Sequence, residues 1–196
     1  MTKYFEEYIT DVKDYLSQMI VTDSEKGVIN NEEGLLQWTA KLKEIKDEKK
    51  GRLFFAGNGA SATMAEHMSH DFFQNADVVT VTCAETSHIT AISNDISYED
   101  VFAYRIKKMM NERDMLITIS SSGNSPNIVK AIKAANEIGM YTVTLSGMKP
   151  DNRSRQNGKL NFYVPAQTYG MVESCHAVLL HSWLDQFLDK YMGGRH

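Results

Sequence analysis

Short apolar runs alternate with longer amphipathic segments over most of the chain beyond residue 51. Runs of four or five residues rich in Val, Ile, Leu, Phe and Tyr are typical of buried strands. Five such runs occur, at 53–56, 78–82, 115–119, 141–145 and 160–164. Between and after them, the spacing of apolar positions predicts helices near 60–73, 99–111, 125–138 and 170–192. This alternation predicts an α/β fold, with a central five-stranded parallel sheet and helices on both faces.

The first fifty residues follow a different pattern. Apolar side chains recur at three- and four-residue steps between residues 4 and 20, and again within 31–50. Such steps place them on one face of a helix, so we expect two N-terminal helices. No linker rich in proline, glycine or serine divides the chain. We therefore expect one domain over 1–196, in which 1–50 forms a helical extension for oligomer contacts and 51–192 forms the α/β core.

The composition excludes several classes of protein. Hydrophobic residues make up 42% and charged residues 23%, which is typical of a globular protein. The net charge is −4 and the basic residues are scattered, so we expect no nucleic-acid partner. No stretch approaches the roughly 18 apolar residues of a membrane span. The first residues lack the apolar run of a signal peptide, and the two cysteines form no disulfide framework, so we expect a cytoplasmic protein.

Two of the predicted strands end in glycine- and serine-rich turns, at 56–61 and 120–126. Each turn leads into a predicted helix, whose first N–H groups and positive dipole end favour an anion. The second turn adds four hydroxyl donors, which is more than a turn requires: Ser120, Ser121, Ser122 and Ser125. Ordinary turn chemistry explains the first turn equally well. Neither turn continues into Gly-Lys-Ser/Thr, which excludes a nucleotide P-loop. The pattern favours a phosphate site beyond the carboxyl ends of the strands.

Four stretches together carry a family resemblance: Gly-Asn-Gly-Ala-Ser at 57–61, Glu-Thr-Ser-His-Ile at 85–89, Asn-Asp at 94–95, and Ile-Ser-Ser-Ser-Gly-Asn-Ser at 119–125. In this order they resemble the sugar isomerase (SIS) domain family, and most of all its heptose phosphate isomerases. The resemblance implies a flavodoxin-like three-layer sandwich and a homotetramer whose active sites are shared between subunits. It also implies conversion of a phosphorylated sugar substrate, sedoheptulose 7-phosphate, to D-glycero-D-manno-heptose 7-phosphate through an enediol.

The resemblance further implies which residues bind the substrate. Four positions match those at which the family contacts phosphate: Ser61, Ser120, Ser122 and Ser125. Three more match positions near the substrate or its sugar: Ser121, Asn58 and Asp95.

Ketose–aldose interconversion needs a base, a proton shuttle and stabilisation of an enediolate oxygen. His67 and Asp71 lie four residues apart, on one face of the helix that follows the first turn. Glu173 and His181 lie eight apart on the last helix, about 80° from one another around its axis. Two histidines and two carboxylates could hold Zn²⁺ or another divalent metal. The same spacings are common in solvated surface pairs, so that alternative stays open.

By the resemblance, His67 and His181 match the family's histidines, whereas Asp71 stands in place of a glutamate and Glu173 in place of a glutamine. Gly170 replaces an acidic residue. We expect His181 to act as acid/base and Glu173 or Asp71 to abstract the proton, with His67 as a metal ligand or shuttle. The departures keep open a non-catalytic SIS protein that binds a sugar phosphate or a replication initiator. Lyase or etherase chemistry on a phosphorylated amino sugar is a third hypothesis.

Overall fold

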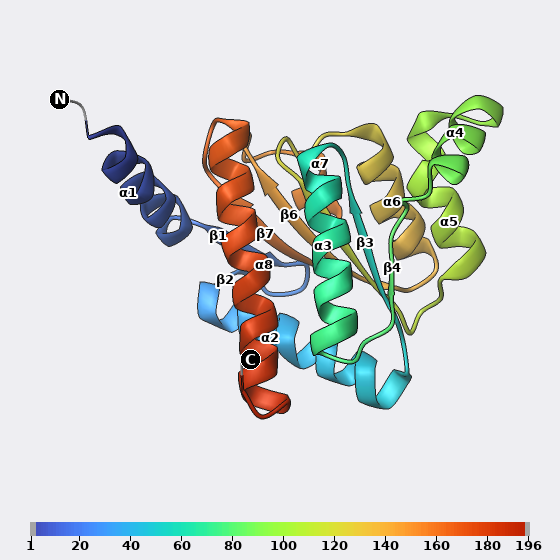
Figure 1. Ribbon diagram of the computed structural model, residues 1–196, viewed down its shortest axis with the longest axis horizontal. Coiled ribbons are helices and arrows are strands. Elements are labelled where there is room, and N and C mark those ends of the chain that lie inside the picture. The colour runs from blue at the N-terminus through green and yellow to red at the C-terminus, as the bar shows by residue number, and fades with distance from the viewer. Residues whose placement is uncertain (1–2, 195–196) are drawn as a thin grey trace.

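The computed structural model describes residues 3–194, and within them a mixed sheet lies between two layers of helices (Figure 1). The sheet is formed by β1 (Ile20–Asp23), β2 (Gly27–Ile29), β3 (Leu53–Gly57), β4 (Thr80–Val81), β5 (Met115–Ser120), β6 (Tyr141–Gly147) and β7 (Leu160–Val164). The helices are α1 (Tyr4–Ser17), α2 (Asn31–Glu44), α3 (Ala60–Asn75), α4 (Thr86–Asp95), α5 (Val101–Met109), α6 (Pro126–Glu137), α7 (Arg153–Asn157) and α8 (Tyr169–Tyr191). A π-helical turn, Ile45–Lys49, extends α2, and a 3₁₀ turn, Tyr98–Asp100, precedes α5.

The five predicted parallel strands are confirmed, and so is the α/β fold. In the described chain the strand order is β2-β1-β7-β6-β5-β3-β4, and every pair from β7 to β4 is parallel. Numbered along the chain, these five strands have the order 2-1-3-4-5, which is that of flavodoxin. All residues of β3, β5 and β7 are buried, because helices cover both faces.

The sheet is larger than predicted, because an antiparallel hairpin adds β1 and β2 beyond β7. The predicted continuation of the first helix to Ile20 is wrong: α1 ends at Ser17, and Ile20 starts β1. Asp23 closes the hairpin, since its Oδ1 accepts hydrogen bonds from two backbone N–H groups of the turn. Gly27 follows with φ +81°, a conformation that glycine adopts without strain. The four residues of β1 are too few for their periodicity to distinguish a strand from a continuation of the helix before it.

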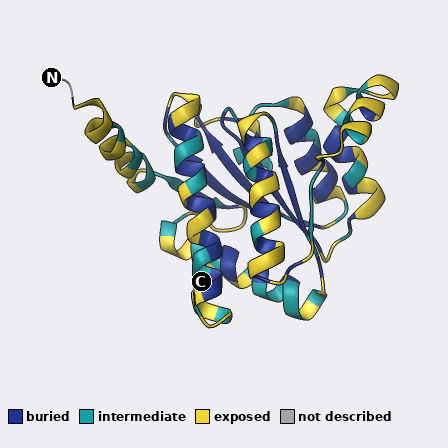
Figure 2. Cartoon of the chain, in the orientation of Figure 1, coloured by how far each residue is buried: buried dark blue, intermediate teal, exposed yellow. Residues whose placement is uncertain are grey.

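Each face of the sheet has its own apolar core. On one face α2, α3 and α8 pack together, and the ring of Trp38 stacks on that of Trp183 with centroids 3.8 Å apart. On the other face, α5 and α6 pack against the sheet. Figure 2 shows the central strands buried and the outer sides of the helices exposed. Within residues 3–194, no helix combines the length and apolar character that crossing a bilayer requires.

Helix α1 extends away from this body (Figure 1). None of its residues is buried, and the side chains of Tyr4 and Phe5 are 73% and 74% exposed. It contacts the first half of α8, where the hydroxyl groups of Tyr8 and Ser174 lie 3.1 Å apart. Tyr8, Val12, Tyr15 and Leu16 pack as partly buried residues against a small apolar cluster at the start of α8, so the exposed apolar surface lies on the other side of α1.

His176 of α8 is fully buried against the sheet. No hydrogen bond of normal geometry reaches either ring nitrogen among the described residues. Burial lowers the pKa of this imidazole to about 4, and the nearby backbone of Ser146 opposes the shift only in part. The folded chain therefore keeps His176 neutral at pH values where an exposed histidine takes up a proton.

This burial predicts a pH-dependent stability that His176→Leu removes. Between pH 6.5 and about 4 the unfolded chain binds a proton at His176 and the folded chain does not. The free energy of unfolding therefore falls as the pH drops through this window, by roughly 3 kcal/mol from this one group. Urea unfolding of both proteins across the window measures the difference. His70→Leu, at an exposed position of α3, is the matched control for the loss of one imidazole. Equal pH dependence in wild type and His176→Leu would contradict the prediction.

Candidate functional site

The two glycine- and serine-rich turns meet at the carboxyl ends of neighbouring strands. β3 pairs with β5 in parallel, with Gly57 opposite Ile119. The chain leaves β3 into α3 on one face of the sheet and leaves β5 into α6 on the other face. Strand order reverses between these strands, and in open α/β sheets such a crevice is where ligands bind.

A pocket of about 280 Å³ lies at this junction. Its lining residues are Asn58, Gly59, Ala60, Ser61, Ile119, Ser120, Ser121, Ser122, Ser125, Tyr169 and Glu173. Six of the seven residues that the sequence predicts as substrate-binding are therefore together, and only Asp95 is elsewhere. The sequence reasoning missed Tyr169, which lines the pocket from the first residue of α8 and belongs to no motif.

The pocket suits an anion through backbone and hydroxyl groups. No lysine or arginine is among its lining residues. α3 and α6 both begin there, and neither N-cap residue, Gly59 or Ser125, caps its helix with a side chain, so the positive ends of both helices face the pocket. The loop also depends on glycine: a Cβ at Gly57 would lie 2.4 Å from the carbonyl oxygen of Ser61. Only glycine lets the two segments approach this closely.

Asp95 does not reach this pocket. It ends α4, is exposed, and its Oδ1 accepts a hydrogen bond from Asn94 Nδ2 at 2.9 Å. α4 follows β4 at the edge of the sheet and lies beyond the helices that flank the pocket (Figure 1). A contact between Asp95 and the sugar in this chain stays a prediction that the pocket lining does not support.

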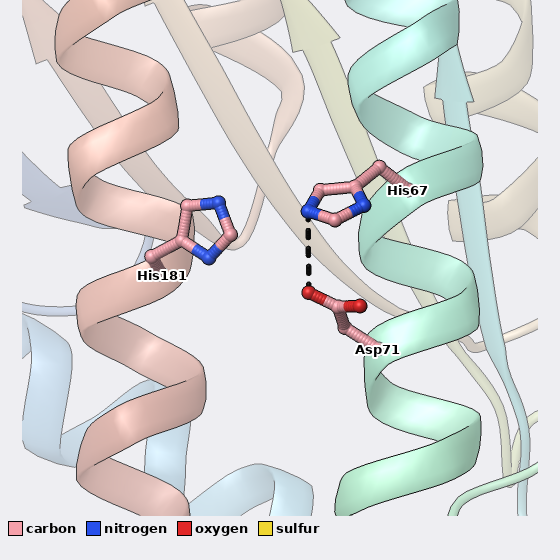
Figure 3. A group of neighbouring side chains, drawn as sticks. All are labelled: His67, Asp71 and His181. Carbon is pink, nitrogen blue, oxygen red and sulfur yellow. Dashed lines mark ion pairs between the residues drawn. The ribbon is translucent and has the colours of Figure 1, made fainter. Parts of the chain in front are cut away.

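A second cluster lies between α3 and α8. His67 and Asp71 point from α3 toward His181 of α8 (Figure 3). The Nε2 atom of His67 is 3.3 Å from Oδ2 of Asp71, and the two imidazole centroids are 5.4 Å apart. One donor atom from each residue lies within 4.8 Å of the others.

The four predicted metal ligands thus divide between two places. Glu173 lines the serine pocket, whereas His181 lies eight residues further along α8, about 12 Å along its axis. Among the described residues, the group whose donor atoms converge contains His67, Asp71 and His181 without Glu173. Two imidazoles and one carboxylate are a donor set that zinc sites use, with a fourth position left for water or substrate. The side chain of His67 is 55% exposed, so an ion can enter from solvent.

The cluster predicts that His67→Ala weakens zinc binding. Mutating a group that hydrogen-bonds to a metal ligand lowers metal affinity by roughly tenfold or more. Because His67 would be a ligand itself, we expect its loss to lower the affinity at least as much. Competition with a chromogenic chelator at neutral pH measures the dissociation constant. His70→Ala is the matched control, because His70 is exposed on the same helix and lies outside the cluster. Equal affinities in the two variants would mean that these side chains hold no metal.

Known proteins resemble the chain in sequence and in fold. A family model described as the SIS domain matches residues 7–147. Phosphoheptose isomerase of Helicobacter pylori (strain P12) is 31% identical over 144 residues, covering 70% of this chain and 74% of that protein. Phosphoheptose isomerase 1 of Campylobacter jejuni is 32% identical over 149 residues, covering 73% of this chain and 79% of that protein.

Solved structures resemble the chain along almost its whole length. Phosphoheptose isomerase GmhA from Neisseria gonorrhoeae has a TM-score of 0.80 at 25% identity, and the match covers 95% of both chains. A phosphoheptose isomerase from Francisella tularensis has a TM-score of 0.79 at 20% identity, covering 97% of this chain and all of that one. The second likeness supports the fold alone.

Proposed function

Because the chain belongs to the SIS domain family and, within it, to the phosphoheptose isomerases, we propose that it interconverts sedoheptulose 7-phosphate and D-glycero-D-manno-heptose 7-phosphate. The observation that carries the proposal is the serine pocket, where an anion site and the carboxylate of Glu173 share one cavity. The relatives are isomerases, so the non-catalytic alternative is not favoured.

We assign the phosphate of the substrate to the serine pocket. The hydroxyl groups of Ser61, Ser120, Ser122 and Ser125 and the two helix N-termini can donate to its oxygens. An anion held by dipoles and hydroxyls keeps a fixed position without a flexible cation. That position sets where the carbonyl end of the sugar lies.

The length of the sugar fits the spacing between the pocket and the histidine cluster. From Ala60, where α3 begins, to His67 the helix rises about 10 Å. An extended seven-carbon chain with its phosphate spans about 10 Å as well, given C–C bonds of about 1.5 Å. An extended heptose phosphate anchored at the serines would therefore reach His67. Because Glu173 lines the pocket itself, it can act on C1 and C2 only if the sugar chain folds back toward the serines.

Glu173 is the proposed proton-abstracting base. It takes a proton from C1 of the ketose, which gives an enediolate, and returns a proton to C2 while the hydroxyl proton moves from O1 to O2. Its carboxylate lines the pocket, whereas Asp71 is paired with His67, so the geometry favours Glu173 over Asp71. The carbonyl carbon and its neighbour must come within about 3.5 Å of this base.

We assign His67, Asp71 and His181 to a divalent metal site. A bound Zn²⁺ would supply polarisation of a sugar oxygen. Without metal, His181 is free to act as acid/base; a ring nitrogen that binds a cation cannot also accept a proton. His181 can therefore act either as a metal ligand or as an acid/base at that nitrogen, but not as both at once.

Glu173→Gln tests the assignment of the base. In deuterated water the wild type should incorporate deuterium into sedoheptulose 7-phosphate, and the variant should lose at least about 10²-fold in rate, as expected for removal of a general base. Mass spectrometry or proton NMR measures the exchange. Glu66→Gln is the matched control, because Glu66 is an exposed carboxylate on α3 outside the pocket. Full exchange in Glu173→Gln together with its loss in Asp71→Asn would move the base to Asp71.

We further propose that α1 mediates assembly into a homotetramer. Phe5 and Ile9 are 74% and 53% exposed, and a groove of about 600 Å³ between α1, α2 and α8 is lined mostly by apolar residues. A second copy of this chain would bury both surfaces, and its α1 has the matching apolar face.

The double variant Phe5→Asp/Ile9→Asp should dissociate this assembly, because two charges at its centre would have to lose their hydration. Light scattering or sedimentation measures the mass. Glu6→Gln, on the exposed side of α1, should leave it unchanged. A monomeric wild type at micromolar concentration would refute the proposal. If active sites are shared, isomerase activity should fall together with the mass.

A further inference from the structure

A hydrogen-bonded chain of three side chains borders the serine pocket. Asn58 of the first turn and Asn127 of α6 bond to each other through both amides, with each Nδ2 donating to the other's Oδ1 at 2.9 Å. The hydroxyl of Tyr98 donates to Oδ1 of Asn58 at 3.0 Å. Tyr98 comes from the 3₁₀ turn after α4, and its side chain does not line the pocket itself.

The network fixes which way each amide points. The backbone N–H of Ile128 donates to Oδ1 of Asn127 at 2.9 Å, so this atom must be the oxygen. Nδ2 of Asn127 therefore donates to Asn58, whose facing atom must be its Oδ1. Tyr98 then takes the second lone pair of that oxygen.

One N–H bond of Asn58 remains for a ligand. Nδ2 carries two hydrogens; one goes to Asn127, and the other has no acceptor among the described residues. Asn58 lines the pocket, so the network presents a single oriented donor there. A rotated amide would present its oxygen instead and repel the lone pairs of a substrate oxygen.

We propose that Tyr98 is a positioning residue of the isomerase site, which together with Asn127 keeps the Asn58 amide in the orientation that donates to the sugar phosphate. This inference rests on the proposed function. The Tyr98 hydroxyl acts only through Asn58, and the ring stands at the rim of the site with the residue 53% exposed. Tyr98 therefore affects the affinity for the substrate and takes no part in the proton transfer.

The turn that carries Tyr98 is held without the phenol. Ser97 Oγ donates to Oδ2 of Asp100 at 2.6 Å, and Nζ of Lys130 on α6 lies 3.1 Å from the same carboxylate. Nζ of Lys130 also pairs with Glu99 at 3.2 Å. Removing only the hydroxyl should therefore leave the backbone in place.

Tyr98→Phe tests the inference. Its KM for sedoheptulose 7-phosphate should rise roughly three- to tenfold, the range expected for one hydrogen bond, while kcat changes less than about twofold. In the Asn58→Ala background the same substitution should have no further effect, because the hydroxyl acts through that amide. Tyr104→Phe is the matched control on α5: its ring packs on His88, and KM should not change.

Binding by calorimetry separates this inference from the reaction itself. A heptitol 7-phosphate, which has no carbonyl and cannot react, should bind Tyr98→Phe roughly three- to tenfold more weakly than wild type. If the wild type does not isomerise the ketose, but Tyr98→Phe still binds the heptitol 7-phosphate more weakly than the wild type does, the proposed function fails and the positioning role stands. An unchanged KM and affinity in Tyr98→Phe, or an equal loss in the Asn58→Ala background, would overturn the positioning role.

Discussion

Hydrogen bonding between β3 and β5 is the constraint on which the site depends. Parallel pairing in register, Gly57 beside Ile119, makes both strands end at the same level of the sheet. Since the crossovers then leave toward opposite faces, two helices start from adjacent points with their N–H ends converging. The backbone alone therefore forms an anion site at this point of the sheet. The serines and Asn58 refine a binding position that the backbone has already created.

The sequence predicted this part well because its signals are local. Apolar runs marked the five parallel strands, and the loop after β5 showed more hydroxyls than a turn needs. The hairpin was missed because Ile20 also fits the helical spacing of the residues before it. Its strand identity depends on pairing with β7, whose residues lie between 137 and 143 positions further along the chain. The pattern of neighbouring residues does not identify a pairing strand so far away in the sequence.

The predicted metal ligands lie in two separate places for a similar reason. Spacing within α8 places Glu173 and His181 on the helix, but which of them meets His67 depends on how α3 packs against α8. That packing is set by large side chains between the helices and the sheet, such as Phe72 against Trp183, with centroids 4.3 Å apart. Tyr98 gave no signal at all, because an exposed tyrosine in a turn has no partner that sequence can identify.

Gly170 shows how one departure from the family pattern is accommodated. The position has no side chain, and a Cβ there would lie 3.6 Å from the hydroxyl of Tyr8. That hydroxyl meets Ser174, the neighbour of Glu173, so α1 contacts the turn of α8 that carries the proposed base. The placement of Glu173 is therefore sensitive to how α1 packs.

The hairpin has a consequence for how copies of this protein can meet. Without β1, the five-residue strand β7 would present an open row of backbone donors and acceptors. With it, the described sheet is bordered by β2 with three residues and β4 with two. Borders this short offer little template for adding a foreign strand, so cross-β growth has no ready starting point. Contacts with another protein would therefore use helices or loops rather than strand edges.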